Sequence, residues 1–321
     1  MDQARRNMPL KNKSGRGRIY QRGVRALTKY WQLYVMLILP IIFIFIFCYM
    51  TYPGLRIAFM NYKPAKGWNS DWVGFETFRK IFADHDFWRA LRNTVVFNVI
   101  ELFAGFPVPI ILALLINELR LKGFKRVSQT ILYLPHFLSS VIVASIAYTL
   151  FKPETGLVNV IMMNLGIIET GIPFLTEKYH WAVTYILINI WQGMGWGSIV
   201  YLSAMSAINS ELYEAATVDG ANRFQRLWHI TLPGIKPTVV MLLIMRLGSM
   251  LGSGFERLNA FGNVNVKEFQ YQLSVYIYEK GIRGGAFSQS TAVGLFSTLV
   301  GLILVLTADR IAKKLGEDGL I

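Results

Sequence analysis

The stretch that decides the fold reads SELYEAATVDGANRFQRLWHITLP and spans residues 210–233. Apolar windows at 181–206 and 238–255 flank it, so we expect an ordered loop between two membrane spans. Ser210 is a suitable N-cap for a first helix, because its hydroxyl can accept a hydrogen bond from a free backbone amide. Gly220 then predicts a turn, since glycine adopts a positive φ without strain.

A second helix is expected after this turn. Phe224, Leu227 and Trp228 recur at helical spacing. Pro233 and Pro237 are expected to end that helix and to lead into the next span. Two interpretations of the loop stay open at this point. It is either an amphipathic segment in the membrane interface or a foot that docks into another protein.

Outward from this loop, apolar segments dominate the chain. Hydrophobic residues make up 53% of the 321 residues and charged residues only 16%, whereas soluble domains carry roughly a quarter. This composition argues against a soluble enzyme and against a disordered chain. A bilayer core needs about 20 apolar residues in a helix. The windows that meet this length are 33–52, 93–116, 127–151, 181–206, 238–255 and 288–308. The sequence therefore predicts an all-α integral membrane protein with six transmembrane helices.

Lysine and arginine are unevenly divided between the two sides of these windows. They number 33 against 19 Asp and Glu, a net charge of +14. More of them lie on the side of the N-terminal tail, so the positive-inside rule puts both termini in the cytoplasm. We interpret the basic tail as a topology signal rather than a nucleic-acid site. The predicted domains are a basic cytoplasmic tail (1–32), a first transmembrane helix (33–52), an extracytoplasmic segment with an interfacial helix (53–92), a core of five transmembrane helices (93–308) with a cytoplasmic loop (207–236), and a cytoplasmic tail (309–321).

The interfacial helix is predicted from three aromatic residues. Phe75, Phe78 and Phe82 are spaced i, i+3, i+7 and so share one helical face. This pattern is typical of a helix lying on the membrane surface. The alternative is a docking face for an external partner.

Motifs of enzymatic chemistry are absent from the sequence. No Gly-Lys dipeptide occurs, so there is no P-loop for ATP, and HExxH, CxxC and GxSxG are missing as well. The single cysteine, Cys48, cannot form an internal disulfide. The histidines show no ligand spacing. We expect neither an enzyme nor a metal or cofactor site in this chain.

The loop at 207–236 resembles the EAA loop of permeases from binding-protein-dependent ABC importers. That pattern is Glu-Ala-Ala, three residues, Gly, nine residues, Ile-x-Leu-Pro. Its elements here are Glu214, Ala215, Ala216, Gly220, Ile230, Leu232 and Pro233, with Asp219 before the glycine. Softer matches at 133–135 and 290–296 are similar to the carbohydrate-importing branch, and those at 34–62 and 72–78 to LplB-like permeases for oligo- and polysaccharides.

The resemblance implies a MalF-type permease core in the bacterial cytoplasmic (inner) membrane that does not itself hydrolyse ATP. It implies four kinds of partner: a second homologous permease subunit in a heterodimer, two ATP-binding cassette subunits that hold ATP and Mg, an extracytoplasmic solute-binding protein, and membrane lipid, but no nucleic acid. In this family the EAA helix sits in a cleft of the ATPase. Glu214 would offer its carboxylate there, Ala215 and Ala216 would keep the contact face small, and Gly220 would set the turn angle.

Polar residues inside the apolar windows are candidates for a substrate pathway, because they are costly in a bilayer. They form three stripes with i, i+3, i+7 spacing: Asn98/Glu101/Gly105, Asn189/Gln192/Trp196 and Arg246/Ser249/Ser253, with Trp191 beside the second. Trp191 and Trp196 could stack on sugar faces, while Gln192 and Arg246 donate hydrogen bonds or Arg246 holds a uronate carboxylate. The alternative is that Glu101 and Arg246 neutralise each other and that the amides and serines join helices.

Two other classes of protein compete with the importer permease. One is a secondary transporter driven by an ion gradient, with Glu101 as its proton carrier. The other is a membrane enzyme such as a glycan synthase. Neither requires a loop that docks an ATPase, so the EAA-like loop favours the importer.

Overall fold

The computed structural model describes residues 30–252, 254–317 and 319–320. These residues are mostly helical, with no β-strand among them beyond one antiparallel bridge between Met60 and Trp72. The predicted all-α fold is therefore confirmed. Most of the basic tail and Ser253 of the third polar stripe lie outside the described residues. The chain divides into two compact units, 1–56 and 57–321.

The first unit contributes a single apolar helix to the described structure. Helix α2 (Trp31–Phe47) contains Pro40, and none of its side chains is buried. A 3₁₀ helix, η1 (Tyr49–Phe59), follows it. Together they form a segment, Trp31–Phe59, that is long and apolar enough to cross a membrane; the span predicted at 33–52 lies within it and stays a prediction.

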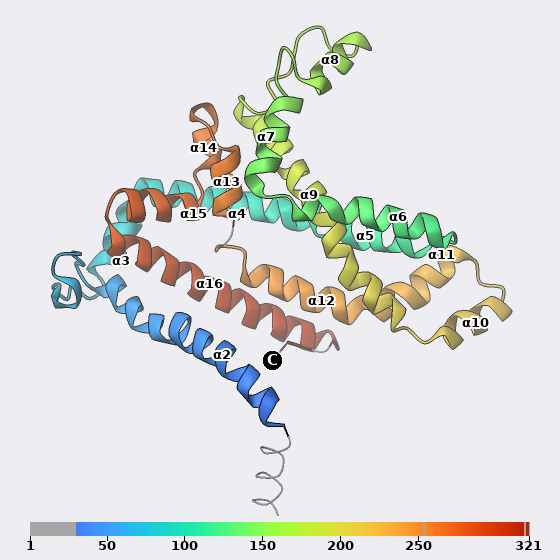
Figure 1. Cartoon of the computed structure of the whole chain (residues 1–321), viewed down its shortest axis with the longest axis horizontal. Helices are drawn as coiled ribbons and strands as arrows, with labels where there is room; N and C mark the ends of the chain where they lie inside the picture. Colours follow the sequence, from blue (N-terminus) through green and yellow to red (C-terminus); the bar gives the residue numbers. More distant parts are fainter. Residues whose placement is uncertain (1–29, 253, 318, 321) are drawn as a thin grey trace, which may run out of the picture. The chain divides into compact units, whose positions relative to one another are not determined.

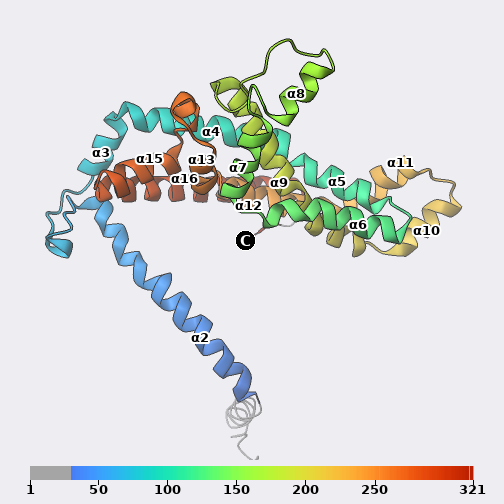
Figure 2. The ribbon, with the colours of Figure 1, turned by 45° about the horizontal axis from the view of Figure 1, so that its top comes forward.

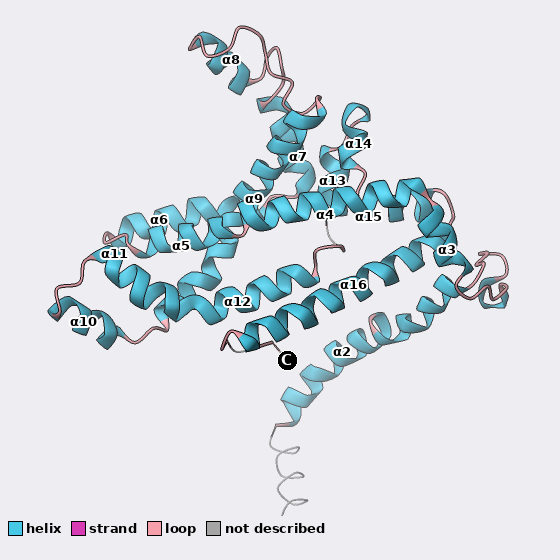
Figure 3. Ribbon diagram, turned by 180° about the vertical axis from the view of Figure 1, so that it is seen from behind, coloured by secondary structure: helices cyan, strands magenta, loops and turns pink. Residues whose placement is uncertain are grey.

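The second unit is built from helices joined by short connections (Figure 1). In chain order they are η2 (Gly67–Asn69), α3 (Glu76–Ala83), α4 (His85–Gly105), α5 (Pro107–Asn117), α6 (Lys122–Tyr133), η3 (Leu134–Phe137), α7 (Ser140–Leu150), α8 (Leu157–Asn164), α9 (Lys178–Ser206), α10 (Ser210–Val218), α11 (Arg223–Arg226), η4 (Leu227–Thr231), α12 (Leu232–Gly248), α13 (Phe255–Phe261), η5 (Val264–Val266), α14 (Lys267–Gln270), α15 (Leu273–Tyr276), η6 (Ile277–Arg283) and α16 (Phe287–Lys314). Helix α12 packs along α16, and α5 packs along α9 (Figure 3).

Four helical segments in the described part of the chain can cross a membrane by length and composition. They are Trp31–Phe59, His85–Asn117, Arg223–Gly248 and Phe287–Lys314. The bent pair of α6–η3 and α7 makes a fifth candidate if it counts as one span. Helix α9 is also long enough, with 29 residues, but its polar and glycine residues lower its hydropathy. The six-span count and the orientation of the termini stay predictions.

The predicted span at 127–151 is not one straight helix, because the chain bends by 102° between η3 and α7. Pro135 in η3 lacks the amide that would continue the helical ladder. Ser139 then starts α7 as its N-cap, with its hydroxyl accepting from the backbone amide of Ile142 at 3.3 Å. The Leu138 carbonyl left at the bend accepts a hydrogen bond from Gln192 Nε2 of α9, at 2.9 Å.

The helix after the turn at Gly220 is longer than expected. Pro233 and Pro237 were expected to end it, yet a continuous helical segment runs through both of them, from α11 to the end of α12. The π-helical turn η4 ends at Thr231, two residues before Pro233. Its wider i→i+5 pattern relieves the clash of a proline ring with the preceding turn. The expectation that these prolines are helix stops was therefore wrong.

Aromatic side chains fill the larger of the two cores of this unit. Trp181 of α9 and Phe87 of α4 are fully buried there, together with Phe261 and Tyr276. The smaller core gathers Ala113, Tyr201, Met205 and Ile235. Since both cores use α9, this helix is the central element to which the others attach.

The start of α4 is held by a cluster of charged and polar groups. Asp84 is its N-cap, and Tyr276 Oη donates to the Asp84 carboxylate at 2.9 Å, while Lys280 Nζ lies 3.4 Å from it. Burial by itself raises the pKa of Asp84. The backbone amide of Asp86, the Tyr276 hydroxyl and the Lys280 ammonium outweigh burial, and the pKa of Asp84 is lowered below its ordinary value.

Candidate functional site

The EAA-like loop forms two short helices that extend beyond the ends of α5 and α6 (Figure 2). Helix α10 is capped by Asn209, whose side chain accepts from the Glu211 amide at 3.0 Å. The expected N-cap, Ser210, is instead the first helical residue. Gly220 has φ of 76°, as the turn requires. Asn222 and Gln225 then form a capping box that starts α11.

Side-chain bonds connect the two arms of the loop. The hydroxyls of Tyr213 on α10 and Thr231 on η4 lie 2.9 Å apart. Arg226 Nη1 of α11 donates to Thr217 Oγ1 at 3.1 Å. These contacts brace the loop as one unit, which we call the foot (residues 209–231).

Large apolar side chains on the foot face outward. Val218 is 88% exposed, Phe224 83% and Trp228 68%. The residues matched to the EAA pattern lie along the same segment: Glu214, Ala215, Asp219, Gly220 and Pro233 are exposed, while Ala216, Ile230 and Leu232 are half-buried. An exposed apolar surface of this kind is typical of an interaction site.

A second cluster of predicted residues lies where α4, α9 and α12 meet. Arg246 Nη2 lies 2.6 Å from Glu101 Oε2 in an ion pair. Asn189 Nδ2 donates to the other carboxylate oxygen at 2.9 Å. The predicted mutual neutralisation of Glu101 and Arg246 is thus present. Both oxygens of Glu101 are therefore bound to side chains of neighbouring helices.

Two cavities share this ion pair in their walls. The smaller, of about 310 Å³, is also lined by Asn98 and the larger, of about 410 Å³, by Asn189 and Trp196. Glu101 and Arg246 line both. We call this region the polar junction: the Glu101–Arg246 pair and the two cavities that share it. Cavities of this size can hold a small ligand.

Other residues of the predicted stripes have local structural contacts. Asn98 Nδ2 donates to the Thr94 carbonyl of its own helix at 2.8 Å, and Ser249 Oγ to the Arg246 carbonyl at 3.0 Å. Gln192 is buried and donates to the bend at Leu138. The Gln192 contact joins two segments, as the alternative role predicts, whereas the contacts of Asn98 and Ser249 stay within their own stretch of chain.

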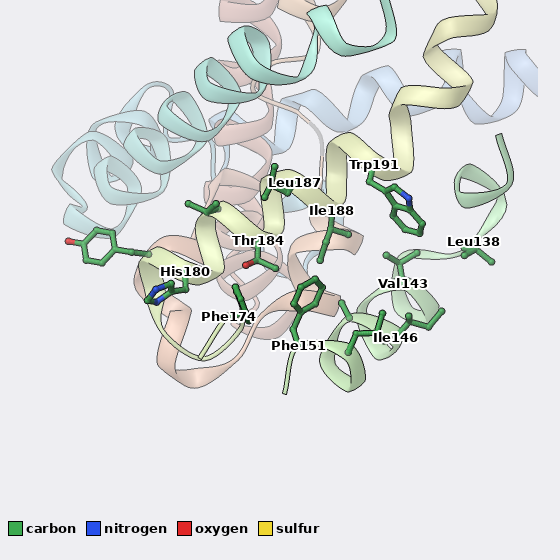
Figure 4. Close-up of a pocket in the computed structure, with 14 residues that line it drawn as sticks. Leu138, Val143, Ile146, Phe151, Phe174, His180, Thr184, Leu187, Ile188 and Trp191 are labelled. Carbon is green, nitrogen blue, oxygen red and sulfur yellow. The ribbon is translucent and has the colours of Figure 1, made fainter. Parts of the chain in front are cut away.

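The two tryptophans of α9 do not share a cavity. Trp196 lines the larger cavity of the polar junction, where His136 stacks on its ring at 4.6 Å with 4° between the ring planes. Trp191 instead lines a separate apolar cavity of about 560 Å³ between α7 and α9 (Figure 4). Five residues on a helix turn the side chain by about 140°, so both rings cannot meet one ligand at this junction.

Sequence reasoning missed Arg257 and His136 as members of the polar junction. Arg257 of α13 lines both cavities, and His136 lines the larger. Arg257 lies in α13, which starts at Phe255, whereas Arg246 lies in α12, which ends at Gly248. Because the helix is interrupted between them, helical periodicity could not have placed Arg257 beside Arg246. In the described residues, no group of three His, Cys, Asp or Glu side chains could hold a metal ion.

Comparisons with known proteins agree with this architecture. A family profile described as "Binding-protein-dependent transport system inner membrane component" matches residues 89–317. Protein LplB of Bacillus subtilis is 44% identical over 298 residues, which cover 92% of each chain. The polygalacturonan/rhamnogalacturonan transport system permease protein YteP of the same organism is 43% identical over 289 residues, covering 90% of this chain and 89% of YteP.

Solved structures show the same similarity. A chain in the crystal structure of a bacterial alginate ABC transporter, in complex with an alginate pentasaccharide-bound periplasmic protein, is 40% identical with a TM-score of 0.82. The match covers 92% of this chain and 99% of that one. A second structure, of a bacterial ABC transporter involved in the import of the acidic polysaccharide alginate, is 41% identical with a TM-score of 0.81, over 91% of this chain and 99% of that chain. The predicted family and permease fold are confirmed.

Proposed function

The chain belongs to the family of binding-protein-dependent transport system inner membrane components, and on this premise we propose that it is one permease subunit of a bacterial ATP-driven importer. It lies in the cytoplasmic membrane and pairs with a second, homologous permease. Together they form the path for an oligo- or polysaccharide that an extracytoplasmic binding protein delivers. The names of the saccharide-transporting relatives support this class of substrate.

The foot is the part of this chain that receives the force of ATP hydrolysis. Its apolar residues Val218, Phe224 and Trp228 are exposed, which supports a docking partner on this surface. ATP and Mg belong to two ATPase subunits, and Glu214 offers them a carboxylate on the outer face of α10. The bonds that brace the foot, Tyr213–Thr231 and Arg226–Thr217, let it move as one body.

The polar junction is the part of this chain that meets the saccharide. Charged and amide groups from α4, α9 and α12 converge there on cavities of about 310 and 410 Å³. Trp196 adds an aromatic face, of the kind on which a sugar ring can rest. The apolar cavity beside Trp191 offers almost no hydrogen-bonding groups, so it suits lipid or a neighbouring helix better than a sugar.

The observation that most supports this proposal is the exposed foot, and co-purification with the ATPase tests whether the foot docks the ATPase. The chain is co-expressed with its partner permease and ATPase, as wild type, as Glu214→Lys and as Glu118→Lys. Glu118 is an exposed acid outside the foot and undergoes the same charge change. We expect the ATPase to be retained by wild type and by the Glu118 variant and to be lost from the Glu214 variant. Absence of ATPase from the wild-type complex would refute the proposal.

A further inference from the structure

One guanidinium in the polar junction has no anionic partner. Arg257 lines both cavities, and its Nε is buried without a hydrogen-bond partner among the described residues. No carboxylate in the described part of the chain lies within the 4.0 Å distance that defines an ion pair with it. Arg257 is half-buried, and a partly desolvated cation without a counter-ion is costly, so this charge needs an explanation.

The nearby acids do not supply a counter-ion. Both carboxylate oxygens of Glu101 are occupied by Arg246 and Asn189. Glu256 lines the smaller cavity only, is exposed, and forms no ion pair with a described residue. The larger cavity therefore has one uncompensated positive charge, from Arg257.

The backbone that presents Arg257 is firmly held. In α13, Leu258 and Phe261 are fully buried. Trp181 Nε1 and Tyr148 Oη both donate to the Phe261 carbonyl, each at 2.9 Å. A short helix anchored in this way keeps its arginine in place before any ligand arrives, which reduces the entropy lost on binding.

We propose that Arg257 binds the carboxylate of a uronate residue as an acidic oligosaccharide passes the polar junction. The planar guanidinium can donate two parallel hydrogen bonds to a carboxylate. Asn189 and Trp196 line the same cavity beside Arg257 and bound the space in which the sugar ring would lie. Glu101 and Arg246 neutralise each other, so Arg257 supplies the charge that favours an acidic sugar over a neutral one. This inference rests on the proposed function of the chain as a saccharide permease.

Uptake by the complete complex in proteoliposomes tests this inference. The complex contains the partner permease, the ATPases and the binding protein. The probes are trigalacturonate and trimannuronate, each as the free acid and as the neutral methyl ester. The variants are Arg257→Gln and Arg257→Lys, with Arg283→Gln as a matched control, since Arg283 is exposed and lies outside the cavities. Complex yield and basal ATPase activity are measured for each variant.

We expect Arg257→Gln to lower uptake of the free acid about tenfold, the effect of losing one charge-assisted hydrogen bond. Arg257→Lys should keep part of this uptake because it keeps the charge, and Arg283→Gln should match wild type. Any methyl ester that wild type transports should be taken up equally by Arg257→Gln.

Four results would overturn the inference. They are wild-type uptake of the acid by Arg257→Gln, equal losses in the Lys and Gln variants, equal losses for acid and ester, and failure of the complex to assemble without the charge. The last would assign Arg257 to an ion pair with the partner permease. A wild-type complex that takes up no uronate also overturns it, and ATPase co-purification then shows whether the proposed function fails as well.

Discussion

Replacing Gly195 by alanine tests how closely α9 and α6 pack beside the polar junction. A methyl group at this position would overlap the carbonyl oxygen of Leu132 and lie 2.5 Å from its carbonyl carbon. It would also lie 3.1 Å from the backbone nitrogen of Tyr133. All three atoms are main chain, so no side-chain rotation can relieve the contact.

The size of the effect follows from this geometry. Carbon–carbon contacts are favourable near 3.5 Å, so the two backbones must separate by about 1 Å. Overpacking of this kind costs about 1–3 kcal/mol, and we expect the upper end because both partners are backbone. Alanine gains about 1 kcal/mol over glycine in a helix. The net destabilisation is therefore about 2 kcal/mol for Gly195→Ala.

Gly193 provides a matched control two residues away on the same helix. A methyl group there meets no atom within 4 Å, so Gly193→Ala should be neutral or stabilising by up to about 1 kcal/mol. Thermal unfolding of the purified permease, measured by loss of the monodisperse peak after heating, should give a midpoint several degrees lower for Gly195→Ala than for wild type. Equal midpoints for the two alanine variants would refute the packing argument.

Three further predictions concern other parts of the chain. Glu101→Gln leaves Arg246 without its counter-ion and should cost about 2 kcal/mol of stability, between the values for exposed and buried pairs, because the Glu101 and Arg246 side chains are 18% and 41% exposed. Adding Arg246→Gln should restore part of the lost thermal unfolding midpoint. Strictly additive destabilisation in the double variant would contradict this. Gly220→Ala places a Cβ at φ of 76°, which costs about 1–2 kcal/mol. We therefore expect weaker ATPase co-purification than with Gly220→Asn, because asparagine tolerates this conformation. Equal retention of the ATPase by the two variants would count against a role of the turn geometry in docking. Asp84→Asn keeps the N-cap but removes the charge. Since the pKa of Asp84 is lowered on folding, wild type should be more stable than this variant above the ordinary carboxyl pKa of about 4, and the difference should vanish as pH falls through the lower folded pKa. A stability difference unchanged down to pH 2 would show that the carboxylate is not its source.

Local features of the foot could be predicted from the sequence because they depend on neighbouring residues. The turn at Gly220 and the helices on either side of it follow from residue preferences within a few positions. Ser210 was predicted as the N-cap, but Asn209, one residue earlier, caps α10. Serine and asparagine both cap helices well, so their residue types do not distinguish the two positions. The prolines were misjudged because a single π-helical turn, which no local preference announces, lets the helix continue through Pro233.

The polar junction shows the limit of such reasoning. Spacing placed Glu101 and Arg246 each on a helix face, but their 2.6 Å contact joins residues 145 positions apart. Periodicity identifies a polar face and does not say which faces meet. The sequence alone determined that this chain is an all-α membrane protein with a helix–turn–helix loop at 210–233, because hydropathy and turn chemistry are local. Only the tertiary structure decided that Trp191 and Trp196 line different cavities and that the chain bends between α6 and α7 at Leu138. It also decided that Arg257 lines the polar junction without an ion-pair partner among the described residues. Each of these features depends on the packing of distant helices against α9.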